Sequence, residues 1–320
     1  MLKEGLQMAR TDLKKRLLRI STLRMVVQFL SFIFFSIAIL NLGSLPLLLP
    51  IMWTWGLQQN TVGDAFTAIQ LMSSGWQQPN QIFPWLAIAS FLIVGVLVGK
   101  SLCGWVCPFG FIQDLVGFIK ARKMEVSQKT HDDMKLVKYL VLGITLFITL
   151  TFSLAKLLKV HGNYEKAMGI FAYAPFTTIS PAETLFATLP KMVRNFSNAA
   201  IEKPILEVLA GVTDLPSLFW IQLFILVGVL VLAAHIPRGW CKYLCPHGAI
   251  MAILNKFSFM GLKRDPIKCV KGECRECVKA CPMQVRILEQ PWEKINDPEC
   301  IYCFKCVDVC PNKAIRLKYP

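Results

Sequence analysis

The sequence predicts a mostly α-helical membrane protein, with four transmembrane helices in two pseudo-symmetric pairs, followed by a small cysteine-rich α+β domain. Hydrophobic residues make up 54% of the 320 residues and charged residues only 17%, and the mean hydropathy is +0.49. The apolar residues are segregated into long runs, and eight of the 12 cysteines lie in the last fifty or so residues. A soluble domain of ordinary composition does not combine these features.

The apolar runs set the domain boundaries, because a span needs about 20 predominantly apolar residues. The four predicted spans cover about residues 25–42, 83–99, 136–158 and 218–236. Residues 1–24 form a basic cytoplasmic lead-in without a cleavage site, which we expect to be an uncleaved anchor. The membrane domain then occupies residues 25–261, and the cysteine-rich domain occupies residues 262–320.

The distribution of Lys and Arg predicts the orientation. Residues 43–82 contain neither, whereas residues 100–135 contain six. Because basic residues accumulate on cytoplasmic loops, the first loop should lie outside and both termini in the cytoplasm. We therefore expect a multi-pass protein of a bacterial or archaeal cytoplasmic membrane. The net charge of +15 follows from these flanking residues, and without an aromatic-interleaved basic patch we expect no nucleic-acid partner.

The cysteine-rich domain carries a bacterial-type ferredoxin pattern. Cys300, Cys303, Cys306 and Cys310 form a C-x2-C-x2-C-x3-C-P run, in which three thiolates bind one [4Fe–4S] cluster and the fourth reaches another. This spacing predicts a double-cluster domain with two ligand sets. The first cluster would take Cys269, Cys274, Cys277 and Cys310, and the second would take Cys300, Cys303, Cys306 and Cys281.

The upstream group departs from the pattern, since four residues separate Cys269 from Cys274. The alternative is a pair of zinc sites. Structural zinc usually takes two short Cys/His pairs separated by a longer insert, so the spacing favours iron–sulfur clusters. Such clusters need reduced thiolates, which agrees with a cytoplasmic domain.

An internal repeat predicts the paired architecture. Lys100 begins Lys-Ser-Leu-Cys-Gly-Trp-Val-Cys-Pro-Phe-Gly after the second span, and Arg238 begins Arg-Gly-Trp-Cys-Lys-Tyr-Leu-Cys-Pro-His-Gly after the fourth. Both contain C-x3-C-P-x-G at a cytoplasmic helix end. On the outer side, Thr61 to Asp64 and Ser180 to Glu183 each match a helix-capping box. Two helix pairs related by an axis along the membrane normal explain this pattern.

The repeated cysteines predict a third site. Cysteines four apart lie on one face of a helical turn, so two symmetric pairs can meet as four thiolates. Cys103, Cys107, Cys241 and Cys245 would then hold a third iron–sulfur cluster shared by the two halves. Redox-active thiols and simple packing remain the alternatives.

The four spans, the two C-x3-C-P motifs and the double-ferredoxin tail resemble the NapH family over about residues 25–315. Members of this family are membrane quinol dehydrogenase subunits of periplasmic nitrate reductase systems, and the polyferredoxin part of NosR and the protein MauN share their plan. The resemblance implies an electron-transfer subunit with quinone or quinol as substrate. Its partners would be the lipid bilayer, the quinone pool and iron–sulfur or cytochrome redox subunits.

Quinol oxidation at the outer face must release two protons, which requires titratable groups there. Asp64, His161 and Glu183 are candidates, although capping alone also explains the two carboxylates. Tyr164 and Tyr173 are phenolic groups on the same side. His235 is a candidate for tuning the site of Cys103, Cys107, Cys241 and Cys245 on the cytoplasmic side, which we call the inner cysteine site. The repeat assigns no role to His247.

Three functions compete. Quinol can be oxidised in the membrane domain, with electrons passing through the inner cysteines and the tail to a partner. A cytoplasmic donor can instead reduce the tail, with quinone or an outer acceptor receiving the electrons. A third function is an assembly or redox-sensing accessory role for a metalloenzyme. No flavin fingerprint or C-x-x-C-H haem motif occurs in the sequence, so nucleotide and haem chemistry would belong to partners.

Overall fold

The computed structural model describes residues 20–39, 66, 69–70, 83–119, 124, 126–173, 175–190, 192–193, 217–270 and 274–319. Their contacts define two compact units, which we describe separately. The cluster unit is drawn from Met1–Ile33, Leu92–Ile112 and Gly248–Pro320, and the helical unit from Phe34–Phe91 and Gln113–His247. The predicted cysteine-rich domain therefore shares a unit with parts of the predicted membrane domain.

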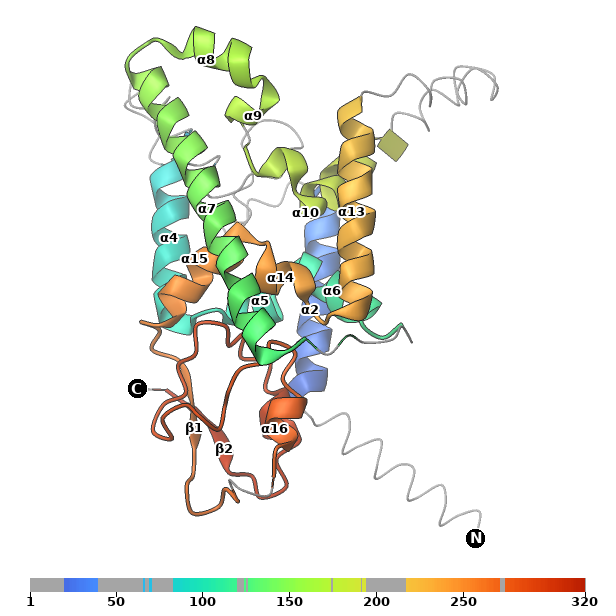
Figure 1. Ribbon diagram of the computed structural model, residues 1–320, viewed down its shortest axis with the longest axis vertical. Helices are drawn as coiled ribbons and strands as arrows, with labels where there is room; N and C mark the ends of the chain where they lie inside the picture. Colours follow the sequence, from blue (N-terminus) through green and yellow to red (C-terminus); the bar gives the residue numbers. More distant parts are fainter. Residues whose placement is uncertain are drawn as a thin grey trace, which may run out of the picture. The chain divides into compact units, whose positions relative to one another are not determined.

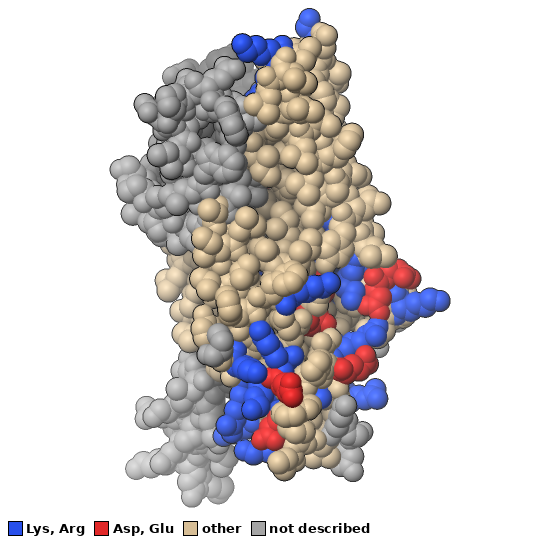
Figure 2. Space-filling view, turned by 90° about the vertical axis from the view of Figure 1, so that its left-hand side faces the viewer, with Lys and Arg blue, Asp and Glu red and all other residues tan. Residues whose placement is uncertain are grey.

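Among the described residues, two helices are long and apolar enough to cross a membrane, namely α7 (Gln128–Leu157) and α13 (Ser217–His235) (Figure 1). Many of their apolar side chains are exposed, as shown by Phe147 at 69% and Phe224 at 80%. On the face in Figure 2, charged side chains gather mainly in one region and leave a broad surface without them. Such a surface is suited to hydrocarbon rather than to water.

The helix bounds agree with the predicted spans to different degrees. Helix α13 and α4 (Phe83–Val98) lie within one residue of the prediction, whereas α7 begins eight residues before the predicted start at 136. Helix α2 spans Ile20–Ile39, so the predicted boundary after residue 24 falls inside it. The reason is Arg24, which is buried within the helix and donates from Nη1 to the Gly104 carbonyl at 3.3 Å.

In the cluster unit, β1 (Gly261–Arg264) pairs antiparallel with β2 (Ile315–Lys318), with Gly261 opposite Lys318 (Figure 1). Two short helices accompany this ribbon, α16 (Glu276–Lys279) and α17 (Lys305–Asp308). The mixture of strands and short helices is the α+β arrangement that the sequence predicts for the tail.

The tail is also tied to the first long helix. Asp308 of α17 accepts hydrogen bonds from the backbone N–H groups of Ile20 at 3.3 Å and Ser21 at 2.9 Å. The tail therefore contacts the first described residues of α2.

In the helical unit, α7 leads into α8 (His161–Met168) and α9 (Ile170–Tyr173) (Figure 1). The chain continues through η1 (Thr177–Ile179), α10 (Pro181–Glu183) and η2 (Thr184–Thr188), all of which pack against α13.

Ser180 is the N-cap residue of α10, as the capping box predicts, but its side chain makes no capping hydrogen bond. Pro181 follows at the first position of the helix, where its fixed φ and missing N–H favour a helix start. All three residues of α10 are buried. Proline and packing therefore define this helix start, and the predicted cap does not.

Candidate iron–sulfur sites

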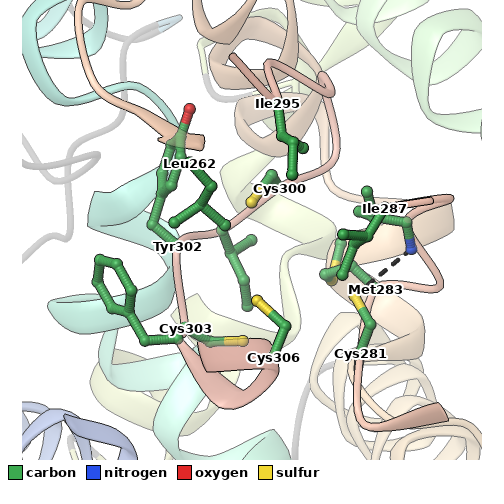
Figure 3. A pocket seen from close by; sticks show the side chains of 12 residues that line it. Leu262, Cys281, Met283, Ile287, Ile295, Cys300, Tyr302, Cys303 and Cys306 are labelled. Atoms are coloured by element: carbon green, nitrogen blue, oxygen red, sulfur yellow. Dashed lines mark hydrogen bonds between the residues drawn. The ribbon is translucent and has the colours of Figure 1, made fainter. Parts of the chain in front are cut away.

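One cavity in the cluster unit is bounded by four cysteines (Figure 3). They are the four that spacing assigns to the second tail cluster: Cys281, Cys300, Cys303 and Cys306. The rest of the wall is mostly apolar and includes Leu262, Met283, Ile287 and Ile295. Thiol donors around a water-poor cavity fit an iron–sulfur cluster, whose potential depends on burial.

The local backbone explains how three close cysteines can face one cavity. Tyr302 and Phe304 adopt left-handed conformations, with φ of 47° and 57°. These two residues flank Cys303 and reverse the chain direction, so that α17 begins directly afterwards and carries Cys306. Left-handed residues other than glycine are uncommon, and their clustering is a mark of functional loops.

The thiol neighbours of Cys277 and Cys300 each come from one predicted set, whereas Cys306 also has a neighbour from the other set, Cys277. Burial raises the pKa of the Cys277 thiol, and Cys269, Cys274 and Cys310 raise it further. Burial likewise raises the pKa of the Cys300 thiol, followed by the effects of Cys306, Cys281 and Cys303. No three His, Cys, Asp or Glu side chains of the described chain have the geometry of a single-ion site. The second set instead surrounds a cavity.

Each set also receives a backbone hydrogen bond at the sulfur of its remote cysteine. The N–H of Val285 donates to Cys281 Sγ at 3.4 Å, and the N–H of Ala314 donates to Cys310 Sγ at 3.3 Å. Hydrogen bonds to sulfur stabilise its negative charge and tune the cluster potential. The two halves of the tail thus offer matched surroundings.

The two C-x3-C-P segments have the same local structure. Cys103 lies in α5 (Ser101–Trp105) and Cys241 in α14 (Gly239–Tyr243), and the second cysteine of each pair follows just after the helix end. The backbone N–H of Cys107 donates to the Leu102 carbonyl, and that of Cys245 donates to the Trp240 carbonyl, both at 3.0 Å. The spacing predicts both cysteines of a pair within one helical turn, but the turn breaks before the second.

The prolines explain this break. Pro108 begins α6 (Pro108–Val116) and Pro246 begins α15 (Pro246–Asn255). Proline lacks an N–H and is favoured in the first turn of a helix. Each motif therefore ends one helix and starts another, with its second cysteine at the junction.

Several residues around these segments carry no sequence signal. Gln113, which is fully buried in α6, donates from Nε2 to Cys241 Sγ at 3.1 Å. The basic residue before each motif is also buried and paired: Lys100 Nζ lies 2.7 Å from Glu299, and Arg238 makes two bonds to Asp114, of 2.9 and 2.7 Å. Buried charges require such partners.

The outer candidates lie on separate elements. His161 begins α8 and Glu183 is buried in α10, while Asp64 lies outside the described residues. The Tyr164 hydroxyl lies 2.9 Å from Thr151 Oγ1 and so ties α8 to α7.

Two histidines lie near the second C-x3-C-P segment in sequence. His235 Nδ1 lies 3.0 Å from the Val231 carbonyl oxygen, so the ring interacts with a backbone group in the last turns of α13. His247, to which the repeat gives no role, is buried against the rings of Phe66 and Phe176, with centroids 5.1 and 5.6 Å away. Because position 109 of the other repeat is Phe, an aromatic packing role is consistent with the repeat.

Comparisons with known proteins match these sites. A family model described as a 4Fe-4S binding domain matches residues 81–126 and 218–264, which contain the two C-x3-C-P segments. A second, described as a 4Fe-4S dicluster domain, matches residues 261–311. No solved structure matches significantly.

Relatives match most of the chain. The uncharacterized protein MJ0750 of Methanocaldococcus jannaschii is 27% identical over 72% of this chain and 79% of its own. The ferredoxin-type protein NapH of Haemophilus influenzae is 26% identical over 93% of this chain and 87% of its own. The regulatory protein NosR of Pseudomonas aeruginosa is 26% identical over 87% of this chain, but only 34% of its own length is covered.

Proposed function

We propose that the chain, which is similar to NapH and NosR, is a membrane iron–sulfur protein that transfers electrons and serves as the quinol dehydrogenase subunit of a redox complex. Quinol would be oxidised in the membrane domain, and its electrons would leave through the inner cysteines and the tail to a partner redox protein. The observation that supports this proposal most strongly is that a 4Fe-4S binding-domain model matches both C-x3-C-P segments and a dicluster-domain model matches the tail.

The residues of the tail are suited to two [4Fe–4S] clusters, which supply one-electron carriers when bound. We assign Cys269, Cys274, Cys277 and Cys310 to one cluster and Cys281, Cys300, Cys303 and Cys306 to the other. The grouping of thiol neighbours supports this assignment. The apolar wall around the second set would exclude water, and the N–H groups of Val285 and Ala314 would stabilise thiolate charge.

We further propose that Cys103, Cys107, Cys241 and Cys245 hold a third cluster. The identical break and proline-initiated helix in both segments support a shared role for them. Gln113 would donate to the Cys241 sulfur and so stabilise negative charge there. Buried thiols that merely pack would not require a buried amide directed at sulfur.

We propose four spans in two pseudo-symmetric pairs, with both termini in the cytoplasm. The absence of Lys and Arg from residues 43–82 supports this orientation. Reporter fusions at Gln78 and Ala199 should then read outside, and fusions at Lys129 and Pro320 should read inside. An inside reading at Gln78 would reverse the orientation of every proposed site.

Quinol-driven reduction of the full-length protein in liposomes tests the function. A reduced quinone analogue, added without oxygen, should bleach the visible iron–sulfur absorbance to a level set by the redox potentials of the couple and the clusters. Dithionite provides the fully reduced reference. If quinol leaves the oxidised protein unchanged while quinone oxidises the dithionite-reduced protein, electrons flow from a cytoplasmic donor towards quinone and the proposal is wrong.

A further inference from the structure

We propose that α5 couples the inner cysteine site to one particular tail cluster, the one held by Cys281, Cys300, Cys303 and Cys306. This cluster would be the first of the two to exchange electrons with the membrane, and the other would serve the partner. The inference rests on the proposed function and adds the order of the relay.

Trp105 makes the first contact. It lies between Cys103 and Cys107 in sequence, and its Nε1–H donates to the Tyr302 carbonyl at 2.8 Å. Its ring also meets Phe304 edge to face, with centroids 5.9 Å apart. Because Tyr302 and Phe304 flank Cys303, the tryptophan bridges an inner cysteine segment and the ligand loop of this cluster.

Gly104 makes the second contact, backbone against backbone. A Cβ atom at this position would lie 2.2 Å from the Ile301 carbonyl oxygen, so only glycine permits the approach. Gly104 follows Cys103 directly, and Ile301 follows Cys300 directly. A cysteine of each ligand segment is therefore only one residue away from this backbone contact.

Buried polar groups hold the loop in this position. Asn255 accepts from the Lys100 N–H at 3.0 Å and donates to the carbonyls of Asp297 at 2.7 Å and Cys300 at 3.2 Å. The ion pair between Lys100 and Glu299 joins the same two segments of the chain. Satisfied buried networks of this kind fix a single geometry, which a reproducible electron-transfer distance requires.

The second repeat does not reproduce the contact. Lys242 and Tyr243 stand where Gly104 and Trp105 stand in the first. Tyr243 instead places its hydroxyl 2.8 Å from His131 Nδ1, within the helical unit. The two contacts made by Gly104 and Trp105 therefore rest on residues that only the first repeat has at these positions.

The predicted ligand set of the other tail cluster lies beside exposed apolar side chains. Close to its ligand Cys269, Ile267 is 94% exposed and Val270 is 46% exposed. Exposed apolar side chains beside a redox centre suit a transient docking surface. Electrons would therefore pass from the inner site to the ligand set that contains Cys300, then to the set that contains Cys269, and finally to the partner.

The electron balance is simple. With clusters bound, each transfer from the site of Cys103, Cys107, Cys241 and Cys245 to the tail cysteines would oxidise the first by one electron and reduce the second by one, with no bond made or broken. Quinol supplies two electrons in two such transfers and loses two protons.

Ligand substitution in the full-length protein tests the order. Cys300→Ser should alter or remove the EPR signal of the second set, and Cys274→Ser that of the first set. In the fully reduced protein, we expect magnetic coupling to the inner cluster to be altered or lost in Cys300→Ser and retained in Cys274→Ser. The opposite pattern would overturn the order.

The role of Trp105 has its own test. Trp105→Ala should slow electron arrival in the tail by about tenfold, equivalent to about 1.4 kcal/mol in barrier, while iron content stays unchanged. Trp292→Ala, a partly exposed tryptophan of the tail, is the matched control. Equal rates in both variants would contradict the coupling. An unmutated protein lacking the third cluster's iron would instead defeat the proposed function, so the two failures are distinguishable.

Discussion

The double variant Cys103→Ser, Cys241→Ser should lose quinol-driven reduction of the tail and keep its reduction by dithionite. Each substitution removes one of two thiolates from one repeat, so the inner site loses half of its ligands. About four of about 12 iron atoms should be lost if the third cluster is a cubane. The tail keeps all eight of its cysteines and should retain its own EPR signals.

The assay contains its own control, because dithionite reduces the tail without the inner site. A variant that keeps its full iron content and its quinol-driven bleaching would contradict the relay. In that case the C-x3-C-P cysteines would be packing residues or redox thiols.

Glu299→Ala should cause a large loss of stability in the cluster unit. Lys100 is 0% exposed and its Nζ lies 2.7 Å from Glu299. Removing one partner of a buried ion pair leaves an uncompensated charge and costs about 3–5 kcal/mol. We expect a lower thermal midpoint and faster tryptic cleavage of the tail.

Glu289→Ala is the matched control. Its partner Arg286 lies 3.5 Å away and both side chains are largely exposed, so the loss should be about 0–1 kcal/mol. Lys100→Met combined with Glu299→Leu should recover part of the stability, because neither charge then remains buried. Equal destabilisation by Glu299→Ala and Glu289→Ala would argue against the buried pair.

The sequence predicts the helices best where apolar runs end in clear signals. Helix α13 is almost wholly apolar and is followed by Pro237 and Arg238, so both of its ends are predicted within one residue. The predicted start of the first span lies too late in the chain because the charged Arg24 interrupts the apolar run on which the hydropathy prediction depends. In the structure Arg24 is buried and bonded to Gly104, a contact that no local pattern encodes.

Three of the four cysteines in each predicted ligand set are close together in sequence, and the ferredoxin pattern supplies the fourth as a prediction. Docking of the tail cannot be predicted in this way, because it depends on pairs such as Lys100 and Glu299, which are 199 residues apart. Gln113 is missed for the same reason, since its bond to Cys241 joins positions 128 apart. Long-range contacts of this kind leave no periodic signal.

Counting iron and acid-labile sulfide in the purified, unmutated protein tests the central claim most directly. Three cubanes predict about 12 iron atoms per chain, and two cubanes with a binuclear cluster predict about 10. About eight iron atoms, the number for two cubanes, together with alkylation of the thiols at Cys103, Cys107, Cys241 and Cys245, would contradict a third cluster there.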